Sequence, residues 1–238
     1  MRKQLFITIL FFVIGHLCVG QVLSLQMNAA GGKYFYLAHN IYDESYQVTY
    51  SGGWTGALET SLIIEKLGFP WLGLNLGIGW KNCYIQGTLR HKARIPRTNL
   101  TAYTLSEGNI RWNFTDFRIL PEVKVFKIQN LYMFAGYYYS SLYRIKTSGI
   151  GKTQYDTFPE SVKGGEHFEQ VLKNKDLSFE NQGLEVKGTS GFSFGLRYVW
   201  KNLDFQIRDD YGKGKNAPYV WFNNHSLTFG IGYNLSIF

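Results

Sequence analysis

The sequence holds few residues of the types that perform catalysis, and histidine is the first to examine. After the first twenty residues the histidines are His39, His91, His167 and His225. Nucleophilic catalysis by serine needs a histidine within hydrogen-bond reach and a carboxylate that orients it. His225 directly precedes Ser226, but adjacent residues of a strand point to opposite faces, so the two are not expected to form a dyad. We therefore expect no enzymatic activity and no catalytic residue.

Metal and cofactor sites are not evident either. His, Cys, Asp and Glu do not cluster at metal-ligand spacing. The glycines of Gly230-Ile231-Gly232 lie in an extended segment and open no helix, so they do not form a phosphate-binding loop. Cys83 is the single cysteine after the first twenty residues, which leaves no partner for a disulfide within that part of the chain. No cofactor-binding site, metal site or cofactor is expected.

Charged residues of both signs recur at alternate positions of extended segments. If that face is enclosed, the charges must pair, because an isolated buried charge is very costly. We interpret them as a salt-bridged plug; the alternative is a narrow ion path or a proton relay. These residues are Glu59, Glu65, Lys81, Asp116, Arg118, Glu122, Lys124, Arg144, Arg197, Asp204 and Arg208.

The elements that position these charges are clearest at the end of the chain, from His225 to Phe238. Side chains alternate between the two faces of a strand, so this segment has one apolar face and one face of small or polar groups. Such a strand is typical of a membrane barrel, which is apolar toward lipid and polar toward the lumen. The apolar face consists of Leu227, Phe229, Ile231, Tyr233, Leu235 and Ile237.

Seven earlier segments show the same alternation, so the sequence predicts eight strands. Pro121 lacks a donor and predicts a bulge or gap, and the parity of Trp112 predicts a register break before Phe117. Apolar residues at helical spacing predict a short helix over residues 166–173. The seven segments are residues 23–29, 54–65, 72–81, 110–127, 131–145, 192–200 and 203–208.

The predicted connections alternate in length. Those after the second, fourth and sixth strands are a few residues long, whereas the others run from about ten to about forty residues. Bacterial outer-membrane barrels have short periplasmic turns and long outer loops. The longest predicted loops are residues 86–109, which include a basic run, and residues 146–187.

The tryptophans are predicted to form two girdles, because indole prefers the membrane–water interface. Four of them fall at predicted outer strand ends and two at periplasmic ends. The outer four are Trp54, Trp80, Trp112 and Trp221, and the periplasmic two are Trp71 and Trp200.

The beginning of the chain reads as an export signal. Arg2 and Lys3 precede an apolar run over residues 5–19, so residues 1–20 are predicted to be a cleaved signal peptide and residues 21–238 the barrel domain. No later apolar run approaches the roughly 20 residues of a membrane helix. The net charge is +8, or +6 without Arg2 and Lys3, which does not argue for nucleic-acid binding by an exported protein.

The order of these motifs resembles a family of small Gram-negative outer-membrane barrels, the "porin family" or outer membrane protein beta-barrel domain. The similar pieces are residues 53–59, 117–125, 131–136, 194–198 and 229–233. The resemblance implies an eight-stranded barrel and transfers no catalytic residue. One departure concerns the end of the chain, where Phe238 is one position out of register with the apolar alternation.

The sequence therefore predicts an all-β, eight-stranded, antiparallel up-and-down transmembrane barrel in the cell outer membrane. The expected function is structural or interaction-based, either through loops 86–109 and 146–187 or as a subunit of an envelope complex. The alternatives are a narrow channel for small solutes or ions and, third, a surface lipid-modifying enzyme. Expected partners are outer-membrane lipid, lipopolysaccharide and envelope proteins, and no nucleic acid.

Overall fold

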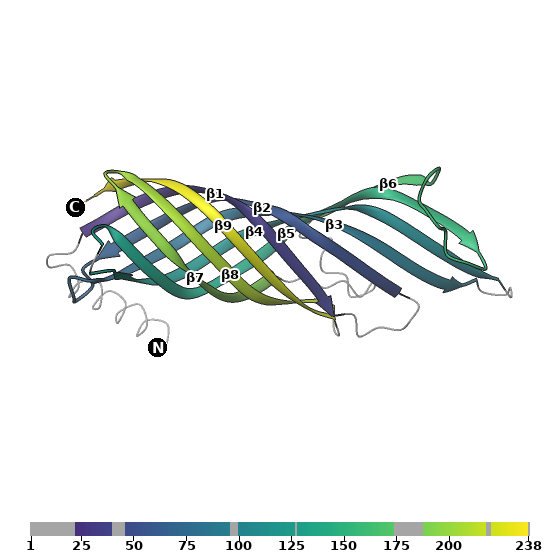
Figure 1. Cartoon of the computed structure of the whole chain (residues 1–238), viewed down its shortest axis with the longest axis horizontal. Helices are drawn as coiled ribbons and strands as arrows, with labels where there is room; N and C mark the ends of the chain where they lie inside the picture. Colours follow the sequence, from purple (N-terminus) through teal and green to yellow (C-terminus); the bar gives the residue numbers. More distant parts are fainter. Residues whose placement is uncertain are drawn as a thin grey trace, which may run out of the picture.

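A computed structural model describes residues 22–39, 46–95, 100–126, 128–173, 188–217 and 220–237. These residues form nine antiparallel strands (Figure 1). The predicted signal peptide and Phe238 lie outside the described residues. The strands are β1 (Val22–His39), β2 (Tyr46–Glu65), β3 (Leu72–Arg94), β4 (Thr101–Lys124), β5 (Leu131–Tyr155), β6 (Glu166–Lys173), β7 (Gly188–Trp200), β8 (Leu203–Ala217) and β9 (Val220–Ser236).

Eight of these strands close into a ring. The hydrogen-bonded order is β4-β3-β2-β1-β9-β8-β7-β5, and β5 also pairs with β4, which completes the barrel. Every barrel strand thus has a neighbour on both sides, so its backbone groups are satisfied within the protein, as a membrane requires. The predicted eight-stranded, up-and-down barrel is confirmed.

The outward face of the barrel is apolar on every strand. Large apolar side chains are exposed around the whole ring. Together they cover a much larger area than the exposed apolar patches of soluble proteins. Lipid is the environment that such a face needs, so the barrel spans a membrane, and closed barrels of this kind are outer-membrane structures. One example from each barrel strand, in chain order, is Met27, Leu58, Ile78, Ile119, Met133, Phe194, Ile207 and Phe229.

At one end of the barrel the strands are joined by short turns, as predicted. These turns are residues 66–71, 125–130 and 201–202, and β1 begins and β9 ends beside them. Asn130 has φ +63°, a left-handed conformation that asparagine tolerates better than most residues. The pairing of β4 with β5 skips Leu120 and Pro121 without a register shift, which is the local gap predicted from proline.

At the other end the structure corrects the predicted loops. Residues 86–109 are mostly strand, because β3 and β4 continue as a hairpin far beyond the barrel. Residues 146–187 include the upper half of β5 and β6, which replaces the predicted helix over residues 166–173. Residues 31–39, 46–53 and 212–217 are also strand, so the long connections of the prediction are extensions of β1, β2 and β8.

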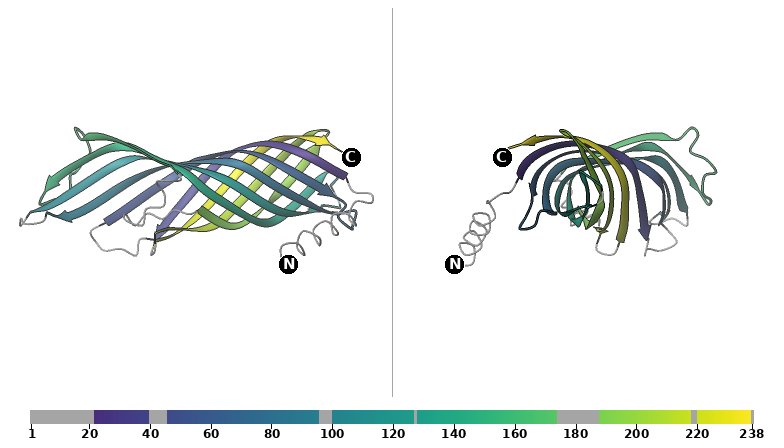
Figure 2. Two further views of the ribbon diagram at one scale, coloured as in Figure 1. Left: turned by 180° about the vertical axis from the view of Figure 1, so that it is seen from behind. Right: turned by 60° about the vertical axis from the view of Figure 1, so that its left-hand side comes forward.

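These extensions form a sheet that leaves the barrel on one side. Above Ser141, β5 exchanges its partner β7 for β6, so β3, β4, β5 and β6 continue as a sheet, called here the projecting sheet, which β2 borders up to the pairing of Tyr46 with His91. Figure 2 shows the ring of strands and this sheet extending from one part of its rim. The alternating pattern ends here because both faces of a sheet outside the membrane contact water.

A bulge marks the transition between barrel and projecting sheet. The β4–β5 register shifts between Asn113 and Phe114, whose partners are Arg144 and Leu142, so Tyr143 is the extra residue. A register shift was predicted between Trp112 and Phe117 and lies there, but its extra residue is in β5, so β4 keeps its alternation and Trp112 stays on the inner face. Beyond Tyr143 the faces of β5 are exchanged, so Ile145 points inward and Arg144 is exposed. The prediction that Arg144 faces the lumen is therefore wrong.

Candidate functional site

The barrel interior contains a continuous network of ion pairs. Arg118 is at its centre: its Nε lies 2.9 Å from Oε2 of Glu59, its Nη2 2.8 Å from Oδ2 of Asp116, and its Nη1 2.8 Å from Oδ1 of Asp210. These residues come from β2, β4 and β8, so the network connects different sides of the lumen. Arg208 adds a bond to Glu59 of 2.9 Å.

A second group of ion pairs lies nearer the end with the short turns. Arg197 Nη2 lies 2.7 Å from Oε2 of Glu122, and Nη1 lies 3.0 Å from Oδ2 of Asp204. Asn75 donates a further hydrogen bond of 3.2 Å to Glu122. The guanidinium carbon of Arg197 is 4.4 Å from the ring centre of Tyr132, which adds a cation–π contact.

The buried charges nearly balance. Among the described side chains, four buried cations face five buried carboxylates, and each of the nine has an ion-pair partner. The predicted plug is thus present for the inward residues, while Glu65 is partly exposed at 27%. The cations are Lys81, Arg118, Arg197 and Arg208, and the carboxylates are Glu59, Asp116, Glu122, Asp204 and Asp210.

Asp210 is the member of the network that the sequence did not predict. The predicted seventh strand ended at Arg208, because Tyr211-Gly212-Lys213 reads as the start of a loop. In the structure β8 continues, and the alternation from Asp204 through Arg208 places Asp210 inside. Extending the alternation by one more pair of residues would have identified it.

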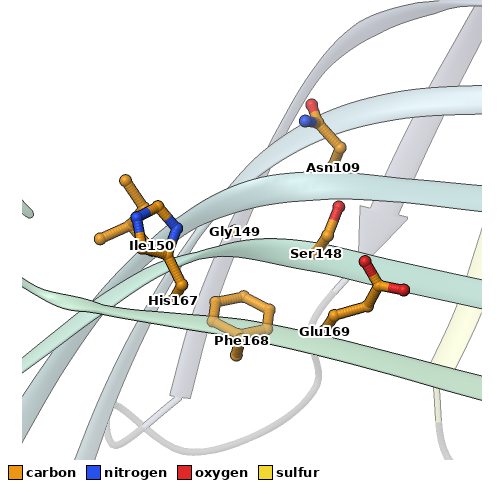
Figure 3. Close-up of a pocket in the computed structure, with 7 residues that line it drawn as sticks. All are labelled: Asn109, Ser148, Gly149, Ile150, His167, Phe168 and Glu169. Carbon is orange, nitrogen blue, oxygen red and sulfur yellow. The ribbon is translucent and has the colours of Figure 1, made fainter.

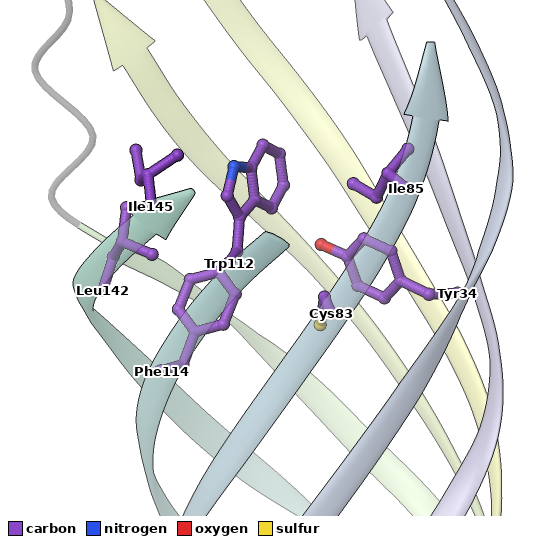
Figure 4. Close-up of a cluster of buried hydrophobic side chains, with 7 residues drawn as sticks. All are labelled: Tyr34, Cys83, Ile85, Trp112, Phe114, Leu142 and Ile145. Carbon is purple, nitrogen blue, oxygen red and sulfur yellow. The ribbon is translucent and has the colours of Figure 1, made fainter. Parts of the chain in front are cut away.

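An apolar cluster fills the barrel above the ion pairs, toward the projecting sheet. Its side chains come from β1, β3, β4 and β5 and converge on the axis (Figure 4). The Trp112 ring packs edge-on against Tyr34 at 6.4 Å and against Phe114 at 6.2 Å between ring centres. The members are Tyr34, Cys83, Ile85, Trp112, Phe114, Leu142 and Ile145.

This cluster corrects one part of the predicted girdle. Trp112 is only 4% exposed and lies inside the barrel, whereas it was predicted at the outer interface. Trp54 and Trp80 do face outward, at 59% and 39% exposure, and Trp200 does so at the opposite end, at 53%. The side chain of Trp221 lies outside the described residues. Trp112 has the inward parity of Phe114 and Asp116, and because β4 itself has no extra residue, its indole stays inside and fills the lumen.

The outer face of the projecting sheet carries a shallow depression. Adjacent strands align Asn109, Ser148 and Glu169 in one row, and the next row contains Ile150 and His167. Figure 3 shows the first three side by side across β4, β5 and β6, with the histidine beside the isoleucine. Gly149 and Phe168 complete the lining of a cavity of about 400 Å³.

The residue types in this depression could suggest catalysis, but their contacts do not assemble a triad. In the described part of the chain no hydrogen bond joins Ser148 to His167, and the carboxylate of Glu169 instead pairs with Lys146 Nζ at 2.8 Å. The predicted separation of His225 and Ser226 is confirmed. His225 Nε2 lies 2.5 Å from Oδ1 of Asp209 on the outward face, while Ser226 lies inside and accepts a hydrogen bond from Lys81.

Within the described residues, no group of three or more His, Cys, Asp or Glu side chains is placed to hold a metal ion. No helix in the described ranges is long and apolar enough to cross a membrane. Cys83 is fully buried beside Thr55, with 3.5 Å between the sulfur and the hydroxyl oxygen.

Comparisons with known proteins find similar architectures only. No family model matches the chain, and no curated protein matches its sequence. Ail of Yersinia pestis, crystallised with the heparin analogue sucrose octasulfate, is 8% identical over 90% of this chain and 99% of its own, with a TM-score of 0.40. Neisserial surface protein A is 13% identical over 90% and 98%, with a TM-score of 0.34.

The outer membrane protease OmpT of Escherichia coli is 9% identical over 91% of this chain and 96% of its own, with a TM-score of 0.33. At such identities the similarity concerns the barrel architecture. The different roles of these proteins do not transfer to this chain.

Proposed function

We propose that this protein is a closed, non-conducting outer-membrane barrel whose role is to present the projecting sheet at the cell surface. The observation that carries the proposal is the filled lumen. Two groups of ion pairs and the apolar cluster occupy successive levels of the barrel. An eight-stranded barrel has an interior that side chains just fill, so little room for water or ions remains.

The position of the projecting sheet supports an interaction role. It continues β3, β4 and β5 beyond the barrel and adds β6, and these strands hold exposed charged residues of both signs, among them Arg90, Lys92, Glu107 and Glu169. A rigid sheet held by a closed barrel offers a stable surface for a partner at low entropic cost. We infer that this surface, rather than the lumen, carries the function.

The test is conductance in planar lipid bilayers. The folded protein, verified by its shift in gel mobility between unboiled and boiled samples, is reconstituted beside a 16-stranded porin as positive control. We expect no discrete conductance steps from this protein, at any applied voltage that leaves the bilayer intact. Reproducible, ion-selective steps would overturn the closed-barrel proposal and favour the narrow-channel alternative.

A second assay addresses enzymatic activity, since a surface barrel can also modify lipid. Mass spectrometry of lipid A from cells that contain or lack the protein compares acyl-chain and phosphate content. We expect identical lipid A. A mass difference that is restored by the plasmid-borne gene would replace the interaction role with a lipid-modifying one.

A further inference from the structure

The outer face of the barrel changes from apolar to cationic over a short distance along β5. The indole Nε1 of Trp80 donates a hydrogen bond to the hydroxyl of Tyr143, and these two rings lie on the outward face at the base of the projecting sheet. Aromatic side chains with one polar atom occupy the membrane–water interface. The pair therefore marks the level at which the lipid chains end.

Three cations follow immediately above this level. Arg144 directly follows Tyr143. Lys146 lies three residues after Tyr143, which is about 10 Å along a strand. Because barrel strands tilt by about 40°, that distance corresponds to roughly 8 Å above the rings. Arg111 is the cross-strand partner of Lys146 and shares its outward face. The three cations therefore lie at the level of lipid headgroups.

Two of these cations are available to a ligand. Arg111 and Arg144 are exposed, and neither forms an ion pair with any other described residue. Lys146 is half-buried and pairs with Glu169 at 2.8 Å. A guanidinium offers a planar set of donors that matches a phosphate, which makes arginine the usual residue for phosphate recognition. Two such groups on neighbouring strands form a site for a phosphate rather than a uniformly basic surface.

The depression described above adjoins these cations. The row of Asn109, Ser148 and Glu169 is the next one along the strands after the row of Arg111 and Lys146. Its amide, hydroxyl and carboxylate groups can exchange hydrogen bonds with sugar hydroxyls, and Ile150 in the next row provides an apolar edge. A cavity of about 400 Å³ is within the range of small-ligand sites.

We propose that this face binds the phosphorylated glucosamine headgroup of lipid A in the outer leaflet. Arg111 and Arg144 contact the phosphate, and the depression around Ser148 contacts the attached sugar. The inference rests on the proposed surface role and names a partner for the projecting sheet. Three features together identify the ligand. They are the guanidinium groups that can donate hydrogen bonds to a phosphate, the polar depression beside them, and their location directly above the lipid-facing aromatic pair.

The experiment measures lipid binding to the whole folded barrel in detergent micelles by native mass spectrometry. The probes are bisphosphorylated lipid A, lipid A from which both phosphates have been removed, and phosphatidylglycerol. We compare wild-type protein with the double variant Arg111→Gln/Arg144→Gln. The matched control is Arg90→Gln/Lys92→Gln, which removes the same charge from the outward face of the same sheet but farther from the membrane.

We expect wild-type protein to bind bisphosphorylated lipid A at least tenfold more tightly than either other probe. Arg111→Gln/Arg144→Gln should weaken that binding about tenfold, while the control changes it less than twofold. Equal losses in both double variants, or equal binding of phosphatidylglycerol, would reduce the effect to general charge attraction and overturn the proposal. Unchanged binding in a heat-modifiable Arg111→Gln/Arg144→Gln protein would also overturn it.

Conductance separates this proposal from the previous one. A barrel that conducts but binds lipid A as described would contradict the closed lumen alone. A silent barrel that does not distinguish lipid A from phosphatidylglycerol would contradict the lipid A site alone.

Discussion

The guanidinium of Arg118 on β4 and the carboxylate of Asp210 on β8 form a two-point ion pair inside the barrel. Nη1 lies 2.8 Å from Oδ1, and Nη2 lies 3.1 Å from Oδ2. Asp210 also accepts a hydrogen bond of 2.7 Å from Ser193 and lies 3.5 Å from the ammonium of Lys81. The pair therefore connects strands that are not neighbours in the ring, and it holds the barrel closed across its lumen.

Asp209 and Asp210 provide a matched pair of substitutions, because consecutive residues of β8 face opposite sides. Asp210→Asn leaves Lys81, which is 3% exposed, without its carboxylate partner, so we expect a loss of about 3–5 kcal/mol in unfolding free energy. Asp209→Asn removes a partly exposed pair with His225 and should cost about 0–1 kcal/mol. Urea unfolding in lipid vesicles, followed by gel mobility, measures both. Equal losses of unfolding free energy in the two variants would contradict the central role of Asp210 in the ion-pair network.

Cys83 reports whether the lumen is sealed. Its thiol is buried in the apolar cluster, so a membrane-impermeant maleimide should not label it in intact cells but should label it fully after boiling in detergent. Lys92→Cys in a Cys83→Ser background is the positive control, because this exposed position lies on the projecting sheet. Rapid labelling of wild-type protein in intact cells would show that solvent reaches the cluster from outside.

The lipid-facing band can be tested with a charge at its centre. Phe229 is 59% exposed and lies midway along the outward face of β9, so Phe229→Arg should destabilise the barrel by about 2–4 kcal/mol. Tyr155→Arg places the same charge at the end of β5, where the exposed side chain contacts water, and should change stability by less than about 0.5 kcal/mol. Urea midpoints in vesicles compare them. If Phe229→Arg leaves the stability unchanged, Phe229 on β9 does not face lipid.

The β3–β4 hairpin of the projecting sheet should be dispensable for folding. Gly87 and Gly108 are paired across β3 and β4, so residues 88–107 can be replaced by an Asn-Gly turn that joins the strands at this point. The ion pairs and the apolar cluster lie below the cut, and we therefore expect a heat-modifiable barrel that still inserts into vesicles. A protein that no longer folds would assign the hairpin a structural role instead of a presenting one.

The barrel could be predicted from sequence because one physical constraint acts on every membrane strand. Lipid on one side and a polar lumen on the other force the two-residue alternation seen from Leu227 to Ile237, and the short turns follow from it. Above the membrane that constraint disappears. Residues 86–94 and 101–109 are strands without an alternating signal, so the sequence predicts a loop there, and the spacing of three apolar residues in Glu166–Lys173 predicts a helix.

The interior was predicted in part, for a related reason. The parity rule placed Glu59, Lys81, Arg118 and Arg197 correctly, because their strands continue without interruption. It failed for Arg144, because the extra residue at Tyr143 exchanges the faces of β5. A bulge is defined by the pairing between two strands, so the sequence of a single strand does not show where it occurs. The depression at Ser148 and His167 was not predicted, because it brings together residues from three strands that no local pattern connects.

The bulge at Tyr143 also governs which changes in chain length the upper strands can accept. Removing Tyr143 would leave an unbroken β4–β5 ladder in which Leu142, Arg144 and Ile145 keep their faces, because Tyr143 is the residue without a partner. A single-residue insertion or deletion between Arg144 and the end of β5 would instead turn the strand over beyond the altered point and exchange its inner and outer faces. Between Arg144 and the end of β5, related sequences are therefore expected to differ in length by two residues at a time, whereas at Tyr143 they can lose a single residue.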